Sequence, residues 1–246
     1  IGWGSWKEEG EVSGTANGQK RLEAVKIRLT EEMEERYDIY YRVHAQNFGW
    51  MGWAKNGEAA GTEGYGYRVE AIQIKIVKKG AHAPGTTEQC FSKKWPSIVY
   101  SAHVQDIGWQ NNVKDGALAG TTGESKRVEA IKISLSGQKA EGSVEYSAHV
   151  QDIGWQKSVK DGALAGTTGK GKRVEAIKIN LTGTLSESCD VYYRVHAQDY
   201  GWLGWTKNGN PAGTEGLSKR IEAIEIKVVT KGDTAPEMGK EAFVKK

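Results

Sequence analysis

The sequence predicts an all-β protein in which three short repeats at a time close into a pseudo-threefold, β-prism-like module. Three observations support this fold class. One motif recurs five times in the 246 residues. Its apolar stretches either alternate with polar residues or are rich in β-branched residues, as β-strands are. Within a group, successive motifs are spaced by 46 or 47 residues, and units of that size must bury their apolar faces against one another.

Each repeat is marked by a Gly-Trp pair and by residues at fixed distances after it. A Gly follows the Trp by seven residues, a Gly-Thr pair by eleven and twelve, an Arg by eighteen and a Glu by twenty. The five tryptophans, which number the repeats one to five, are Trp3, Trp50, Trp109, Trp155 and Trp202. Because this spacing is invariant, we expect each repeat to be one supersecondary unit with loops of fixed length.

Strands and turns are predicted at matching places in each repeat. In repeat four, residues 146–151 alternate and residues 174–179 are rich in β-branched residues, so both are expected to be strands. Two-residue hairpin turns, with a positive φ at both positions, are predicted at Asn56-Gly57, Asp115-Gly116, Asp161-Gly162 and Asn208-Gly209. The Gly-Thr-x-Gly element is expected to be a second tight turn. The only helical signal, at residues 31–36, is interpreted as a charged linker.

A larger repeat of 152 residues is superimposed on the smaller one. It takes Trp3 to Trp155, and it takes residues 78–94 to the closing stretch at 230–246. The larger unit is therefore three repeats followed by a tail.

Two domains follow from this larger repeat. Residues 1–94 are predicted to be an incomplete module, holding the last two repeats and the tail, and residues 95–246 a complete one. The strand expected before Gly2 is missing. Because an incomplete module leaves a sheet edge and an apolar face open, we expect residues 1–94 to dock on residues 95–246 or to self-associate with a neighbouring molecule.

Two other architectures remain as alternatives. A β-trefoil also has threefold symmetry, but it needs four strands in each repeat and only three are evident here. A five-bladed propeller is disfavoured because the step from Trp50 to Trp109 is 59 residues, which interrupts the even spacing.

The motif resembles that of a known family. Repeat four runs Tyr-x-x-His-Val-Gln-x-x-Gly-Trp, then Lys-Asp-Gly, Ala-Gly-Thr-x-Gly and Arg-x-Glu-Ala-Ile-x-Ile. This pattern resembles the clostridial hydrophobic-with-tryptophan (ChW) repeat, and the resemblance covers nearly the whole chain. It implies a secreted or surface-displayed, non-catalytic module of Gram-positive anaerobes that takes part in adhesion or polysaccharide contact. It implies no particular ligand.

Composition excludes several classes of function. The net charge is only +3 and charges of both signs are interleaved, so the basic stripe of a nucleic-acid-binding protein is absent. No run of eighteen apolar residues is present, so membrane insertion is not expected. Cys90 and Cys189 are too few for a disulfide framework and form no C-x-x-C motif, so they are interpreted as free thiols. No cofactor or metal site is predicted.

The tryptophans divide into two groups. Those of the Gly-Trp pairs are assigned to the structural core, because every repeat has one and an indole buries a large area; the alternative is a ligand platform. The position three residues later holds Trp in three repeats and a small polar residue in two. Such a position is not expected in a deep core, so it is the ligand-binding candidate, where an indole would stack on a sugar ring; the alternative is packing between repeats or modules. These candidates are Trp6, Trp53, Trp205, Asn112 and Ser158.

The Arg-x-Glu pair, Arg173 and Glu175 in repeat four, is also assigned to the structural core, with a His and a Gln that recur before each Gly-Trp pair. A carboxylate can act as a general acid or base. However, an active site in such an array is expected to be unique, and these groups recur in every full repeat. No carboxylate pair breaks the repeat as in glycoside hydrolases, and Gly-Thr-x-Gly lacks the Lys of a phosphate loop. The protein is therefore predicted not to be an enzyme.

Two functions remain. The first is an extracellular module that binds a polysaccharide or surface glycan, in which linked weak sites gain avidity from their number. The alternative is a structural or adhesive array whose repeats bind a protein partner or one another. Exposure of Trp53 and Trp205 in a groove favours the first function, and their burial between repeats favours the second.

Overall fold

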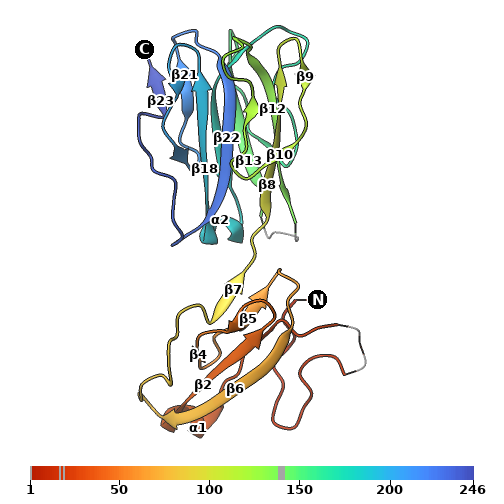
Figure 1. Ribbon diagram of the computed structural model, residues 1–246, viewed down its shortest axis with the longest axis vertical. Helices are drawn as coiled ribbons and strands as arrows, with labels where there is room; N and C mark the ends of the chain where they lie inside the picture. Colours follow the sequence, from red (N-terminus) through yellow and green to blue (C-terminus); the bar gives the residue numbers. More distant parts are fainter. Residues whose placement is uncertain (1, 17, 19, 138–141) are drawn as a thin grey trace. The chain divides into compact units, whose positions relative to one another are not determined.

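A computed structural model divides the chain into two compact units, Ile1–Lys94 and Trp95–Lys246. It describes residues 2–16, 18, 20–137 and 142–246. Nearly all of the regular structure is β, which confirms the all-β fold class (Figure 1). Because the repeats are split between two units, they do not form the single array that a five-bladed propeller requires.

The second unit contains three mainly antiparallel sheets, each built mainly from one repeat. Repeat three contains β8 (Ser97–Val104), β9 (Gly108–Trp109), β10 (Val113–Lys114), β11 (Ala119–Gly120) and β12 (Val128–Ser136). Repeat four contains β13 (Val144–Val150), β14 (Gly154–Trp155), β15 (Val159–Lys160), β16 (Ala165–Gly166) and β17 (Val174–Leu181). Repeat five contains β18 (Cys189–Ala197), β19 (Gly201–Trp202), β20 (Thr206–Lys207), β21 (Ala212–Glu215) and β22 (Ile221–Thr230). In each repeat the long first strand pairs with the long last strand and with two short strands.

Strand exchange joins the three sheets. The short strand that carries the Gly of the Gly-Thr pair leaves its own repeat and pairs with the last strand of the preceding one. Thus β16 pairs with β12 and β21 pairs with β17. The pairing of β11 with β22 joins the first repeat of the unit to the third. The exchange is therefore cyclic, and it gives this unit its pseudo-threefold symmetry while the sheets stay separate.

The exchanged strand explains the Gly-Thr pair, so the tight turn predicted for the Gly-Thr-x-Gly element is confined to the end of that element. A Cβ at Gly120 would lie 2.3 Å from the carbonyl oxygen of Glu222 and 2.6 Å from the Cα of Ala223 in the neighbouring repeat. The φ of Gly120 is +109°. Only glycine permits both this backbone conformation and this close approach. The tight turn follows three residues later, at Gly123.

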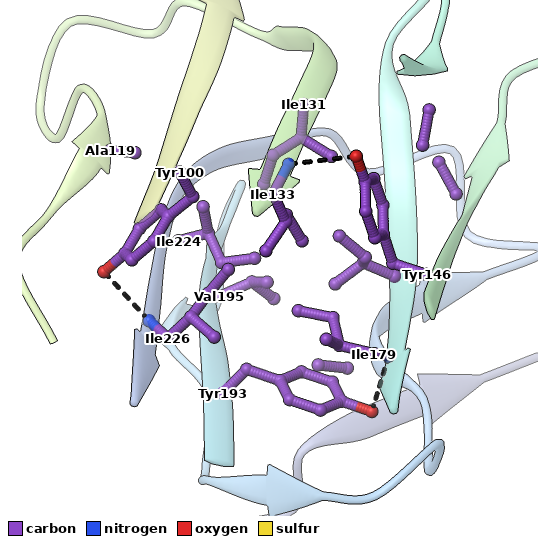
Figure 2. Close-up of a cluster of buried hydrophobic side chains, with 14 of the residues drawn as sticks. Tyr100, Ala119, Ile131, Ile133, Tyr146, Ile179, Tyr193, Val195, Ile224 and Ile226 are labelled. Carbon is purple, nitrogen blue, oxygen red and sulfur yellow. Dashed lines mark hydrogen bonds between the residues drawn. The ribbon is translucent and has the colours of Figure 1, made fainter. Parts of the chain in front are cut away.

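One hydrophobic core lies between the three sheets of the second unit, and a tyrosine stands at each junction between repeats. Each tyrosine hydroxyl donates a hydrogen bond to a backbone carbonyl of its own repeat. It also accepts one from a backbone N–H of the preceding repeat (Figure 2). Tyr146 accepts from the N–H of Ile133 at 3.0 Å, Tyr193 from that of Ile179 at 3.1 Å and Tyr100 from that of Ile226 at 3.0 Å. These hydroxyls satisfy buried backbone groups and tie each repeat to the next.

The predicted Asn-Gly and Asp-Gly turns are confirmed. In repeat three, Asp115 has a φ of 40° and Gly116 one of 88°. The Asp115 side chain also accepts a hydrogen bond from the N–H of Ile98 at 2.9 Å. The same contact occurs in the other full repeats. The turn residue thus sets both the reversal of the chain and the start of the first strand.

The first unit has the same parts with one repeat fewer. Its strands are β1 (Ala24–Val25), β2 (Tyr37–Ala45), β3 (Gly49–Trp50), β4 (Ala54–Lys55), β5 (Ala60–Glu63), β6 (Val69–Lys78) and β7 (Phe91–Lys93). Strand β5 pairs with β1 of repeat one and, in parallel, with β7 of the tail. In the second unit the tail strand β23 (Phe243–Lys245) pairs with β21 in the same way. Among the described strands, β6 is paired with β2 alone.

A short helix precedes the last repeat of each unit. Residues Glu31–Arg36 form helix α1, so the interpretation of this segment as a linker was wrong. Three of its four glutamates lie in the first turn and Arg36 lies in the last, where they complement the helix dipole. Helix α2 (Thr184–Ser188) buries Leu185. Cys90 and Cys189 are not joined in a disulfide, in agreement with the sequence interpretation; Cys189 is buried and Cys90 is half-buried.

Candidate functional site

The tryptophans of the Gly-Trp pairs lie at the surface, so their assignment to the core was wrong. Trp155 and Trp202 are half-buried, and the exposed fractions of the other three are 47% for Trp3, 43% for Trp50 and 38% for Trp109. The pairing of the short strand gives the reason. Trp109 lies directly opposite His103 on β8, and the neighbours of His103 on that strand, Ala102 and Val104, are in the core. Because cross-strand partners share a face, the indole must lie on the outer face of the sheet.

Each outer-face tryptophan stands in a cluster of charged and aromatic side chains, which we call the tryptophan cluster. In repeat four the His149 ring meets Trp155 edge to face, with centroids 5.4 Å apart. The Nζ of Lys178 lies 4.3 Å from the centre of the indole. The Nδ1 of His149 is 3.3 Å from Glu175 Oε2, and the Nε of Arg173 donates to Glu175 Oε1 at 2.9 Å.

The cluster recurs with one variation. Edge-to-face contacts of 5.4 to 5.6 Å join His and Trp in repeats two, three and five as well. The cation over the indole is Lys132 in repeat three, but it is Arg42 in repeat two and Arg194 in repeat five, at 4.6, 4.9 and 4.7 Å. Repeat one has Lys26 at 4.5 Å from Trp3 and no histidine partner among the described residues. Every cluster therefore holds an indole under a cation.

The glutamate is the buried centre of the cluster. In repeats three to five, Glu129, Glu175 and Glu222 are each only 5% exposed. One carboxylate oxygen contacts the arginine and the other faces the histidine Nδ1 at 3.0 to 3.3 Å. That Nδ1 is buried and makes no aligned hydrogen bond within the described residues, so the contact is an ion pair when the ring is protonated. These groups hold one another in place, as the sequence predicted for the Arg-x-Glu pair.

An exposed apolar side chain sits at the hairpin tip beside each of four clusters. It stands two residues before the tryptophan. The exposed fractions are 39% for Phe48, 46% for Ile107, 48% for Ile153 and 39% for Tyr200. Single exposed apolar residues are ordinary on protein surfaces. Here, however, an exposed apolar tip residue stands beside a partly exposed tryptophan at the same place in four repeats.

The second tryptophan position is explained by the tail, and its assignment to ligand binding was wrong for Trp53 and Trp205. Trp53 is 8% exposed and Trp205 is half-buried. The N–H of Trp53 donates to the carbonyl of Thr86 at 2.8 Å, and that of Trp205 to Met238 at 3.0 Å. A Cβ on Gly85 would lie 3.1 Å from the Trp53 Nε1, so the tail passes directly over the indole.

Repeats without a tail have no need of this second tryptophan. Asn112 and Ser158 stand at its position in repeats three and four, and both are exposed. Trp6 of repeat one is also 49% exposed, with the Arg28 guanidinium 4.3 Å from its ring centre. In repeats two to five, therefore, this position holds Trp where a tail covers it and a small polar residue where no tail does.

In repeats two to five, the residue directly after the Gly-Trp pair also depends on whether the repeat is covered by a tail. In repeat three, the Gln110 side chain accepts from the Gly120 N–H at 2.6 Å and donates to the Gly120 carbonyl at 3.0 Å. Gln156 does the same for Gly166 in repeat four. In repeats two and five the tail backbone accepts this glycine N–H instead, and the residue after Trp is a buried Met51 or Leu203. This alternation between Gln and an apolar residue is visible in the sequence and marks the repeats that a tail covers.

A shallow hollow in the first unit combines a cluster with the tail. Its volume is about 300 Å³. The lining residues are Phe48, Trp50, Met51, Gly52, Thr86, Glu88 and Gln89. It thus brings an exposed indole and a tip aromatic together with polar tail side chains.

The described part of the chain contains neither a membrane-spanning helix nor a metal-binding group. No helix there is long and apolar enough to cross a membrane. Among the same residues, no group of three His, Cys, Asp or Glu side chains is placed to hold a metal ion.

Comparison with known proteins bears on the repeats directly. The family model described as Clostridial hydrophobic W (ChW) matches residues 1–31, 44–78, 103–137, 149–183 and 196–230, one match for each repeat. No curated protein and no solved structure gives a significant match.

Proposed function

We propose, from the premise that the chain belongs to the Clostridial hydrophobic W repeat family, that it is a non-catalytic binding module for carbohydrate, in the form of a polysaccharide or a surface glycan. One observation carries this proposal: repeats two to five each present a partly exposed indole in a preformed cluster on the outer face of a sheet. Preformed sites of this kind lose little side-chain entropy on binding.

The chemistry of the cluster suits a sugar. An indole face packs against the C–H groups of a sugar ring, while neighbouring charged and polar groups bond its hydroxyls. The cation covers one face of Trp155, so the sugar would stack on the other. In repeat four the indole Nε1 already donates to Glu215 of repeat five at 3.2 Å, which fixes the ring plane.

The number of clusters supports a repetitive ligand. A single stacked sugar binds weakly, but several sites linked on one scaffold gain avidity when the ligand repeats as well. A polysaccharide repeats in this way.

The absence of catalysis and the extracellular location belong to the same proposal. The cluster glutamates are held by arginine and histidine in every full repeat, an arrangement that favours structure over acid–base chemistry. The location outside the cell is supported by the family resemblance.

A glycan array with matched variants tests the binding proposal. Replacing Trp50, Trp109, Trp155 and Trp202 by Ala together is expected to abolish the glycan signal of the native chain. The control is Asn112→Ala with Ser158→Ala, at exposed positions outside the clusters, which is expected to bind like the native chain. Circular dichroism checks that both variants are folded. Equal glycan binding by the four-tryptophan variant and the native chain would rule out the clusters as the sugar sites.

A second candidate function is adhesion to a protein partner. The observation that favours it is the aliphatic tip, since Ile107 and Ile153 are exposed beside their clusters and aliphatic side chains pack well against protein surfaces. Replacing both by Ser separates the two functions. Protein adhesion would be lost in this variant, whereas sugar stacking on the indoles would be retained.

A further inference from the structure

The outer strand of the first unit exposes an apolar face. On β6 the exposed fractions are 42% for Ile72, 52% for Ile74 and 49% for Ile76. On β22, the strand 152 residues later, the counterparts Ile224 and Ile226 are 2% and 0% exposed. The same sequence pattern is therefore core in one unit and surface in the other.

The difference lies in what covers the strand. In the second unit, β11 pairs with the free edge of β22, and the Gly116 N–H donates to the Ile226 carbonyl at 2.7 Å. The hydroxyl of Tyr100 accepts from the Ile226 N–H. All three contacts come from repeat three. On β6 the counterpart of Ile226 is Ile74, and no described strand pairs with that edge.

A second open site in the first unit points to the same missing part. In the second unit, the Gly166 strand of repeat four pairs with β12 of repeat three, where a Cβ on Gly166 would meet the Glu129 carbonyl at 2.4 Å. The counterpart in repeat one, Gly14, has nothing within 4 Å of such a Cβ and lies in no strand. In the closed unit, repeat three makes both contacts. A single repeat therefore accounts for both open sites.

We propose that β6 is the docking face of one complete ChW repeat that lies outside residues 1–246, placed ahead of repeat one as repeat three is placed ahead of repeat four. This repeat supplies a Gly-Thr strand to β6, a tyrosine hydroxyl to the Ile74 N–H and a last strand to Gly14.

A second copy of this chain fits less well than such a repeat. The Gly-Thr strands of repeats two to five are already paired within their own units. The one unpaired Gly-Thr segment belongs to repeat one, whose described residues include no first strand with a tyrosine. A second copy would therefore leave the Ile74 N–H without its acceptor.

The test is to add such a repeat, together with the first strand that the described residues of repeat one lack. Residues 95–152 are fused ahead of residue 1, so that Asp152 is followed by Ile1-Gly2-Trp3 in place of Ile153-Gly154-Trp155. In the full extended chain, the amide of Ile74 is expected to exchange with solvent at least about 100-fold more slowly than in the native chain, because its edge becomes paired. Binding of a hydrophobic dye to the exposed isoleucines is expected to fall in parallel.

The control is the same extension carrying Gly120→Val in the added segment. A Cβ at that glycine collides with the backbone of the strand it joins, so this extension is expected to leave the exchange of Ile74 unchanged. In the unextended chain, light scattering measures the oligomeric state and amide exchange measures the protection of Ile74. The proposal is overturned if the extension leaves Ile74 unprotected, or if Ile74 is already protected in the unextended chain. If Ile74 is already protected and the unextended chain is a dimer, a second copy of the chain covers β6. If it is protected and the chain is a monomer, the second unit of the same chain covers β6.

Discussion

Strands β6 and β22 share one pattern, Val/Ile-Glu-Ala-Ile-x-Ile, and differ completely in burial. In the second unit the strand is paired on both edges and its isoleucines face a core shared by three repeats. In the first unit it is paired on one edge and the core is smaller. Burial of this strand therefore depends on closure of the unit by three repeats and not on the sequence of the strand.

The matched isoleucines give the largest contrast. Ile226→Ala is expected to destabilise the second unit by about 2–5 kcal/mol, because it leaves a cavity in a close-packed core. Ile74→Ala, at the same place in the first unit, is expected to change its stability by about 0.5 kcal/mol or less, because its side chain is half-exposed. Calorimetry of the full chain, following each unit's transition, measures both. Equal losses would show that β6 is buried after all.

The junction tyrosines give an intermediate effect. Tyr100→Phe leaves the Ile226 N–H and the Ala117 carbonyl without a partner, so it is expected to cost the second unit about 1–3 kcal/mol. The control is Tyr200→Phe at an exposed hairpin tip, where a change of about 0.5 kcal/mol or less is expected. Chemical denaturation compares the two variants. A cost no larger than that of the control would mean that this hydroxyl does not tie repeat five to repeat three.

The same tyrosine predicts a dependence on alkaline pH. Burial raises the pKa of Tyr100 from 10.0 to about 12. Because the folded pKa is above the ordinary one, the stabilisation is fully present below pH 10 and is lost as the pH rises towards 12. The second unit of Tyr100→Phe is therefore expected to lose less stability over this range than the native unit does. Denaturation at a series of pH values measures the slope, and identical slopes would contradict the assignment.

The acid side gives the smallest effect, and it concerns the tails. Hydrogen bonds from Lys55, Asn56 and the Gly80 N–H hold the pKa of Asp38 well below its usual range. In the second unit burial opposes the shift at Asp190, yet Lys207 and Asn208 still lower its pKa. Because both pKa values are depressed, the stabilisation is present above the ordinary pKa near 3.8 and is lost as the pH falls below it.

The measurement for this prediction is amide exchange of Gly80 between pH 2 and 5, corrected for intrinsic rates, because its N–H is bound to Asp38. Protection is expected to fall with pH in the native chain. In Asp38→Asn it is expected to be weaker at pH 5 and nearly constant over this range. Native protection that does not change with pH would remove Asp38 from the anchoring of the tail.

Local features were predictable from the sequence because local chemistry decides them. The Asn-Gly and Asp-Gly turns need a positive φ at both positions, and the structure has it. Exchange of strands was not predictable in the same way. The glycine of β11 is required by the backbone of a strand about 100 residues away, and in the sequence it is indistinguishable from the glycine of a tight turn.

The tryptophans show why recurrence is a poor guide to burial. The Gly-Trp indole recurs because every outer-face cluster uses it, not because it fills the core. Strand pairing accounts for its position, since the hairpin puts Trp155 opposite His149, which lies between the core residues Ala148 and Val150. Trp53 and Trp205 vary for the opposite reason, because they lie under a tail that only their repeats possess.

The most direct test of the closed three-repeat unit is amide exchange at Ile226 and Ile74 in the same native chain. The Ile226 N–H is bound to Tyr100 inside the core, so it is expected to exchange only when the whole second unit unfolds. The Ile74 N–H, at the open edge of β6, is expected to exchange orders of magnitude faster, while the first unit is still folded. Equal protection of the two amides would contradict the claim that closure by a third repeat, and not the strand sequence, creates the core.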